Sequence, residues 1–234
     1  MIEIIGPRLG QDEPGRMALA INQAAQDQGI DTILSSRPTE GRCIIFCSRD
    51  SASFGAAHQY CTDANAPMLF MSSGLDSIPE HPAYPLVIAP NTSVPILRFV
   101  QRVTNLIRTT EPDTVEVVEH HQPQKQDISG TALWLCRLIA QESSIITPVR
   151  DWDTSSSAWG IPEAYRNGYA VHAVRAVYGD RPEFTKHIIE FGRNNYAAGA
   201  LQLAQVLLEQ PIPPGTLSVL DLLPTIQNIT RNGY

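Results

Sequence analysis

The stretch TVEVVEHHQPQKQDISGTALWLC (residues 114–136) changes from the pattern of a strand to the pattern of a helix. Apolar and polar residues alternate over 114–121, which predicts a β-strand, and Ser129 precedes an apolar run in the position of a helix cap. Paired histidines, a lysine and an aspartate lie between the two elements. Three interpretations of this polar segment compete: a catalytic strip, a metal site, or a loop without chemistry.

Composition limits the class of protein. The chain has 234 residues, of which 43% are hydrophobic and 18% charged, as is typical of a globular protein. A formal net charge of −7 without a basic run argues against a nucleic-acid-binding protein. The sequence has no apolar run of roughly 18 residues, and its opening MIEIIGPRLG predicts a first strand rather than a signal peptide. We therefore expect a cytoplasmic protein that binds neither nucleic acid nor membranes.

The four cysteines predict neither a disulfide nor a zinc site. Cys43 and Cys47 lie on one predicted strand, where four residues span about 13 Å. This distance is too long for a disulfide, and the spacing lacks the CxxC pairing of zinc sites. We expect four reduced thiols, most of them buried.

Short apolar strands alternate with helical segments in the first half of the chain, which predicts an α/β fold. Two alternating segments, 169–179 and 184–193, predict an antiparallel, open-faced sheet in the second half. The polar segment 153–168 is expected to form a long loop that covers the binding pocket. The other predicted strands are 2–6, 31–36, 43–48, 67–73, 86–91 and 114–121, and the predicted helices are 15–29, 53–64, 95–108, 131–143 and 196–210, with an apolar turn at 216–223.

The polar segment resembles the signature of the 4-hydroxy-tetrahydrodipicolinate (dihydrodipicolinate) reductase family, Glu-x-His-His-x-x-Lys-x-Asp-x-x-Ser-Gly-Thr-Ala. In this chain the signature reads Glu119-His120-His121, then Lys125 and Asp127, then Ser129-Gly130-Thr131-Ala132. The resemblance covers roughly residues 43–223. Four further stretches resemble family segments in the same order: MSSG (71–74), APNTSVP (89–95), VHAVR (171–175) and GRNNYAAGAL (192–201).

The resemblance implies two domains and a redox reaction. Residues 1–94 and 197–234 would form a truncated Rossmann-like domain of the nucleotide-binding type. Residues 95–196 would form an α+β domain with an open mixed sheet, which binds substrate and builds a homo-oligomer, either a dimer or a tetramer. The implied reaction is hydride transfer from NADPH or NADH to a cyclic imine or unsaturated carboxylate of small size.

The resemblance also assigns candidate site residues. His120, His121 and Lys125 would contact the substrate and supply the proton, and a histidine titrates near neutrality as this role requires. Free amides at a helix start, together with a nearby cation, suit a carboxylate. The assigned substrate-binding residues are Ser129, Gly130, Thr131 and Arg193, and the assigned cofactor-binding residues are Gly15, Arg16, Ser72, Ser73, Gly74 and Asn91. No metal ion is expected.

The first loop departs from the family pattern. Members open with a strand, Gly-x-x-Gly-x-x-Gly and a helix, which lets backbone amides approach a dinucleotide pyrophosphate. In this chain Gly6, Gly10 and Gly15 are spaced four and five residues apart. Asp12 and Glu13 lie between them and would compete with phosphate for the amides of the helix start.

Two further departures concern a connection and the lysine. Only RPTEGR (37–42) joins the second predicted strand to the third, whereas a parallel crossover usually needs a dozen residues. The second helix and the following strand of the family are therefore expected to be missing. Lys125 lies one residue later than the family lysine, which would turn its side chain to the opposite face unless a bulge near Pro123 compensates.

These residues are compatible with three functions. The first is a reductase with a trimmed nucleotide domain. The second is a cyclase, dehydratase or isomerase that keeps the carboxylate pocket and the proton donors without hydride transfer. The third is a non-catalytic relative with a ligand-binding or structural role. We favour the reductase, because the segments that resemble the nicotinamide-facing turns, 71–74 and 89–95, are retained.

Overall fold

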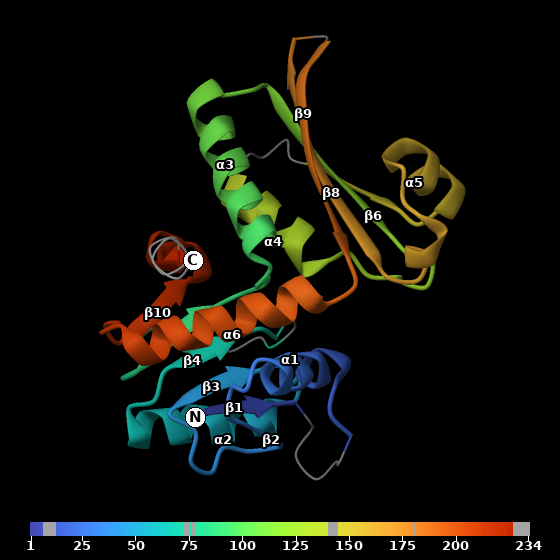
Figure 1. The fold of residues 1–234 in the computed structure, drawn as a ribbon. Coiled ribbons are helices and arrows are strands. Elements are labelled where there is room, and N and C mark those ends of the chain that lie inside the picture. Colours follow the sequence, from blue (N-terminus) through green and yellow to red (C-terminus); the bar gives the residue numbers. More distant parts are fainter. Residues whose placement is uncertain (7–12, 73–74, 76–77, 140–144, 180, 227–234) are drawn as a thin grey trace. The chain divides into compact units, whose positions relative to one another are not determined.

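The computed structural model describes residues 1–6, 13–72, 75, 78–139, 145–179 and 181–226. The chain divides into two compact units (Figure 1). Unit 1 consists of Met1–Val94 and Arg193–Tyr234, and unit 2 consists of Pro95–Gly192.

Unit 1 is built on a parallel sheet. Its six strands lie in the order β10-β5-β4-β3-β1-β2, and every adjacent pair is parallel. This arrangement confirms the predicted α/β class with a Rossmann-like sheet. The first part of the apolar turn predicted at 216–223 is a strand instead, and it pairs with β5 at the sheet edge. The strands are β1 (Ile2–Ile5), β2 (Thr32–Ser35), β3 (Cys43–Phe46), β4 (Met68–Phe70), β5 (Pro85–Ile88) and β10 (Gly215–Ser218).

Helices cover both faces of this sheet (Figure 1). α1 (Arg16–Asp27) and α6 (Asn194–Glu209) pack against each other on one face. α2 (Ser51–Ala64) packs on the other face, where its apolar side chains join a cluster of aromatic and aliphatic strand residues. A short 3-10 helix, Val219–Leu222, follows β10. All four cysteines are free, as predicted.

Two glycines allow close approaches in unit 1. A Cβ at Gly6 would lie 2.3 Å from the Cβ of Ala18 on α1, so the strand and the helix could not pack this closely with a larger residue. A Cβ at Gly199 on α6 would lie 1.8 Å from the carbonyl oxygen of Thr92. The Thr92 hydroxyl also donates a 2.7 Å hydrogen bond to the carbonyl of Tyr196, which fixes α6 against the segment after β5.

The link between β2 and β3 is held by the buried carboxylate of Glu3. β2 and β3 lie on either side of β1, so residues 36–42 pass across β1. The Glu3 carboxylate accepts hydrogen bonds of 2.9–3.2 Å from the backbone amides of Thr39, Glu40 and Gly41. It also accepts hydrogen bonds from the hydroxyls of Ser35 and Thr39.

No helix lies between β2 and β3, where every residue is described, so the predicted loss of the second helix is confirmed. The assumption that a parallel connection needs a dozen residues is wrong for this sheet. A four-residue strand is only about 13 Å long, and seven extended residues reach about 23 Å. The short link therefore spans the strands and takes the place of a helix over β1.

Unit 2 is a four-stranded mixed sheet with helices on both faces (Figure 1). The strand order is β7-β6-β8-β9, in which β6 and β7 are parallel and the other pairs antiparallel. β7 was not predicted, and it is the strand that makes the sheet mixed. The strands are β6 (Thr114–His121), β7 (Ile145–Val149), β8 (Tyr169–Tyr178) and β9 (Arg181–Phe191), and the helices are α3 (Val94–Thr110), α4 (Gly130–Ile139), α5 (Trp152–Trp159) and the 3-10 turn Glu163–Tyr165. Among the described residues, no helix combines the length and apolar character needed to cross a membrane.

The Glu3→Gln variant tests the buried carboxylate. It keeps the size of the side chain but replaces one carboxylate oxygen, which accepts hydrogen bonds from backbone amides, with an NH₂ group that cannot accept them. We expect the free energy of unfolding to fall by about 2 kcal/mol in urea denaturation. Glu13→Gln makes the same change at an exposed position and should alter it by less than about 0.5 kcal/mol. Equal losses in the two variants would contradict the role of Glu3.

Candidate functional site

The site is built on one face of the β6–β8 pair. Glu119 and His121 are two residues apart on β6, so both side chains point to the same face. His172 of β8 is the cross-strand partner of Glu119. The His121 and His172 rings lie 5.6 Å apart between centroids, and His121 Nε2 lies 3.9 Å from the Glu119 carboxylate. α4 packs against β6 and begins beside this face, because the Glu119 carboxylate accepts hydrogen bonds from the Ser129 amide at 3.0 and 3.2 Å.

His120 lies on the opposite face of β6, and both of its ring nitrogens are engaged within the protein. The Trp159 indole donates a 3.1 Å hydrogen bond to Nε2, and Nδ1 lies 2.9 Å from the Ser155 hydroxyl. The Ser155 hydroxyl donates to the carbonyl of Asp151, so His120 Nδ1 carries the proton and donates to Ser155. Burial, together with the nearby Arg150 charge, lowers the His120 pKa and keeps the ring neutral.

The segment 153–168 packs on the His120 face. It forms α5 and the 3-10 turn rather than a long loop, and Asp151 caps α5 by accepting a hydrogen bond from the Thr154 amide. Trp152 packs against Tyr169 beneath this helix. The anchoring contacts of this segment are made to His120, on the side of the sheet opposite His121, and its role as a cover of the binding pocket stays a prediction.

Arg150 is the centre of the polar network on the site face. Its guanidinium forms an ion pair with the fully buried Glu119 carboxylate. It also donates to the carbonyl of Lys125 at 2.6 Å and to the carbonyl of Asp127 at 3.0 Å. One side chain thus ties the end of β7 to β6 and to the loop that leads into α4.

This network also determines the charge on Glu119. Burial alone would raise the pKa of Glu119, but the hydrogen bonds from Ser129 and Arg150 outweigh burial and hold the pKa below its usual range. Glu119 is therefore a carboxylate at neutral pH, and its negative charge occupies the first amide of the α4 start.

Lys125 closes a turn and does not continue an extended strand. The Lys125 amide donates a 3.0 Å hydrogen bond to the carbonyl of Gln122, which closes a β-turn with Pro123 at its second position. The charge of Lys125 lowers the pKa of both His121 and His172, so the ammonium lies near this pair. The structure therefore brings Lys125, His121 and the start of α4 together; their catalytic and binding roles stay predictions.

His121 and His172 are neutral and lack hydrogen-bond partners at one nitrogen each. Burial is the largest cause that lowers the His121 pKa to about 3 and the His172 pKa to about 4. His121 Nε2 and His172 Nδ1 are buried without a hydrogen-bond partner among the described residues. Buried polar atoms are rarely left unpaired, so these two atoms are the polar groups of this face that a ligand would satisfy.

The start of α4 supplies backbone groups. The Ser129 hydroxyl accepts a 3.1 Å hydrogen bond from the Ala132 amide, so Ser129 is the helix cap that the sequence predicted. Gly130 is the first residue of α4, where a backbone amide has no acceptor within the helix. Thr131 is buried in the first turn. Arg193 belongs to unit 1, where it precedes α6, and its assignment to the substrate site stays a prediction.

The described cofactor-binding candidates lie at the carboxyl edge of the unit 1 sheet. Gly15 precedes α1 without a side-chain cap, and Arg16 is the exposed first residue of the helix. Ser72 follows β4, and its buried hydroxyl has no hydrogen-bond partner among the described residues. Asn91 follows β5 and is buried. Ser73 and Gly74, like Gly10 and Asp12 of the first loop, lie outside the described residues.

Sequence reasoning missed Arg150 and undervalued His172. Arg150 follows a strand that was not predicted, and it lies thirty-one positions from Glu119. His172 was not among the candidate site residues, although the alternation of 169–179 already placed it on one face of a strand. Pairing of β6 with β8 was the missing signal. Within the described part of the chain, no group of three or more His, Cys, Asp or Glu residues could hold a metal ion.

Comparisons with known proteins agree on one family. Residues 94–223 match the family model described as dihydrodipicolinate reductase, C-terminus. The chain is 28% identical over 193 residues to the 4-hydroxy-tetrahydrodipicolinate reductase of Rhodopirellula baltica, covering 70% of this chain and 65% of that protein. It is 29% identical over 146 residues to the reductase of the same name from Mycobacterium ulcerans, covering 56% and 57%. The matches thus span less than two thirds of these relatives.

A solved structure shares the fold. The dipicolinate-bound dihydrodipicolinate reductase from Paenisporosarcina sp. TG-14 superimposes with a TM-score of 0.65 and 14% sequence identity. The superposition covers 94% of this chain and 97% of that one. Both units of the chain therefore have counterparts in a single known architecture.

The Arg150→Gln variant tests the network around Glu119. It leaves a buried carboxylate with its main cation removed, so we expect the free energy of unfolding to fall by about 3 kcal/mol. Arg175→Gln breaks the exposed Arg175–Glu116 ion pair of 3.4 Å and should cost less than about 1 kcal/mol. Urea denaturation of both variants provides the comparison, and a loss of similar size in each would argue against the network.

The two buried histidines predict a pH-dependent stability. An unfolded histidine binds a proton near pH 6.5, whereas folded His121 and His172 remain neutral down to about pH 3 and 4. The unfolded state then binds more protons, so stability falls as the pH drops below about 6.5, by up to about 1.4 kcal/mol per pH unit for each histidine. We expect His172→Leu to lower the pH dependence of the free energy of unfolding, measured by urea denaturation between pH 6.5 and pH 5, by the contribution of about one proton, which is about 1.4 kcal/mol per pH unit. An unchanged slope would contradict a neutral His172.

Proposed function

The chain belongs to the dihydrodipicolinate reductase family, and on this premise we propose that it reduces a small cyclic imine or unsaturated carboxylate with NADPH or NADH. The observation that carries the proposal is the pair of buried, unpartnered nitrogens on His121 and His172, which lies beside Lys125 and the start of α4. Two buried polar atoms without hydrogen-bond partners beside a cation are not expected on a face with a purely structural role, because buried polar groups are normally hydrogen-bonded.

The substrate carboxylate binds at Lys125 and Gly130 in this proposal. Lys125 supplies a charge-assisted hydrogen bond, and the Gly130 amide adds a donor at the positive end of α4. Glu119 already occupies the Ser129 amide, so the substrate uses the donors that remain. Glu119 is itself neutralised by Arg150, which limits its repulsion of an anionic ligand.

His121 handles the proton once the substrate is bound. In the free protein its pKa of about 3 keeps it neutral, first because of burial and second because of His172. A bound carboxylate places a negative charge beside the ring and raises its pKa, because an opposite charge favours the protonated form. The proton can then pass to the imine nitrogen. His120 positions β6 in this proposal, since both of its nitrogens are already bonded to Ser155 and Trp159.

The residues of unit 1 fit the phosphate and nicotinamide ends of a dinucleotide. α1 has no acidic residue in its first turn and no side-chain cap at Gly15, so no described side chain caps the amides that a phosphate would use. Ser72 contributes an unpartnered buried hydroxyl at the carboxyl edge of the sheet, where ligands of open α/β sheets bind. By contrast, the amides of residues 39–41 are filled by Glu3, so the adenosine end has fewer donors.

NAD(P)H, when bound, supplies the hydride that adds to the carbon of the C=N or C=C bond, and a proton completes the reduction. The role of this chain is to hold the carboxylate, to keep the ring of His121 beside the accepting atom, and to provide the cation of Lys125. A non-redox enzyme of the same scaffold would use the same carboxylate site without the dinucleotide, so cofactor binding separates the two functions.

Titration with NADPH and NADH, followed by fluorescence, tests the redox part of the proposal. We expect one of the two to bind in the micromolar range and to be oxidised in the presence of a cyclic imine dicarboxylate. If neither binds below millimolar concentration, the reductase assignment fails and the non-redox alternative replaces it.

Dipicolinate binding tests the substrate site, since this aromatic dicarboxylate is bound to the reductase of similar fold. Calorimetry should give an affinity at least tenfold lower for Lys125→Ala, because the change removes a charge-assisted donor to a carboxylate. Arg175→Ala removes an exposed cation from the face of β8 opposite His172 and serves as the matched control with unchanged affinity. Equal affinity in Lys125→Ala and the unmodified chain would remove Lys125 from the site.

A further inference from the structure

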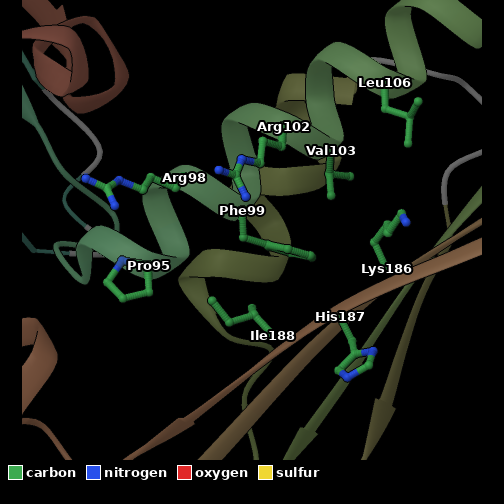
Figure 2. A pocket seen from close by; sticks show the side chains of 9 residues that line it. All are labelled: Pro95, Arg98, Phe99, Arg102, Val103, Leu106, Lys186, His187 and Ile188. Atoms are coloured by element: carbon green, nitrogen blue, oxygen red, sulfur yellow. The ribbon is translucent and has the colours of Figure 1, made fainter. Parts of the chain in front are cut away.

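A groove of about 560 Å³ lies within unit 2 between α3 and β9 (Figure 2). Its volume falls in the range of small-molecule sites, which is about 300–1,000 Å³. None of the residues in the proposed substrate site lines the groove. Ile188 of β9 is the cross-strand partner of His172, so the groove lies on the same sheet face but beside the site.

One side of the groove is apolar. Phe99, Val103 and Leu106 recur on α3 at spacings of four and three, which places them on one stripe of the helix. Figure 2 shows Phe99 extending from α3 towards β9, where Ile188 continues the apolar lining. Phe99, Leu106 and Ile188 are only partly buried, so this stripe is not filled by the protein itself.

The remaining lining is cationic. Arg98 and Arg102 lie one turn apart on α3 and project to the same side, while Lys186 points from β9 towards α3 (Figure 2). None of the three forms an ion pair with a described carboxylate. Three unpaired cations in one groove stand out in a chain whose formal net charge is −7.

Arg98 adds an atom that needs a partner. Its Nε is buried and has no hydrogen-bond partner among the described residues. A buried donor without an acceptor destabilises the free protein, and two arginines four residues apart on a helix repel each other. This arrangement does not stabilise the free protein, whereas an anion in the groove would accept hydrogen bonds from both arginines and offset their charge.

We propose that the groove between α3 and β9 binds an amphipathic organic anion, namely a carboxylate, sulfonate or phosphate ester with an apolar body. The apolar body lies along Phe99, Val103 and Ile188, and the anionic group binds Arg98 and Arg102. Lys186 on the opposite wall binds a second anionic or polar group. The site is independent of the proposed reductase activity, because it shares none of its residues.

Anilinonaphthalene sulfonate is a suitable probe, since it joins a flat apolar body to one anionic group and fluoresces when bound. We expect saturable binding of one probe per folded chain. Arg98→Met and Phe99→Ala should each weaken binding at least tenfold, and the uncharged analogue phenylnaphthylamine should bind at least tenfold more weakly than the sulfonate. Arg108→Gln, a change on the exposed last turn of α3, is the matched control with unchanged affinity.

Thermal unfolding separates a ligand site from a structural role. Arg98→Met removes an unpaired buried donor, so its melting temperature in the absence of probe should equal or exceed that of the unmodified chain. The probe should raise the melting temperature of the unmodified chain and of Lys125→Ala, but not that of Arg98→Met.

Two results would overturn the proposal. One is wild-type affinity for the probe in both Arg98→Met and Phe99→Ala. The other is a concentration-dependent dimer that dissociates in Phe99→Glu, measured by light scattering, because a second copy of the chain would then occupy the groove.

Discussion

The ion pair between Arg150 and Glu119 is the interaction on which unit 2 depends. A carboxylate buried on β6 must be neutralised, and the cation that does so arrives from the end of β7. The remaining donors of Arg150 bind the carbonyls of Lys125 and Asp127, so the loop before α4 is held by the same side chain. The positions of Lys125, Ser129 and the first turn of α4 therefore follow from one buried charge.

Strand alternation places the two adjacent histidines on opposite faces of β6. His121 faces the buried polar network, and His120 faces the helix α5, where Ser155 and Trp159 saturate its ring. The sequence predicted the strand and the helix cap correctly, because both depend on local patterns around residues 114–129. It could not assign the two histidines to different environments, because α5 and β8 come from segments distant in sequence.

The same limit explains the other differences. Arg150 and His172 reach the site through pairings of β6 with β7 and β8, which local patterns do not reveal. The orientation of Lys125 could be judged only once the turn at Pro123 was known. A one-residue shift moves a side chain to the opposite face only where the chain is extended, and residues 122–125 form a turn. The family and fold class were readable from the sequence, since short motifs in the correct order survive such divergence.

The Glu3 carboxylate shows how a parallel sheet can do without the helix between two of its strands. A parallel strand that loses its covering helix exposes apolar surface and a connection without partners. Here the carboxylate of Glu3 on β1 binds the backbone amides of the connection that crosses this strand. The connection then covers β1 in place of a helix. A parallel sheet can therefore carry a strand crossed by a short connection instead of a helix when one buried carboxylate on that strand binds the connection.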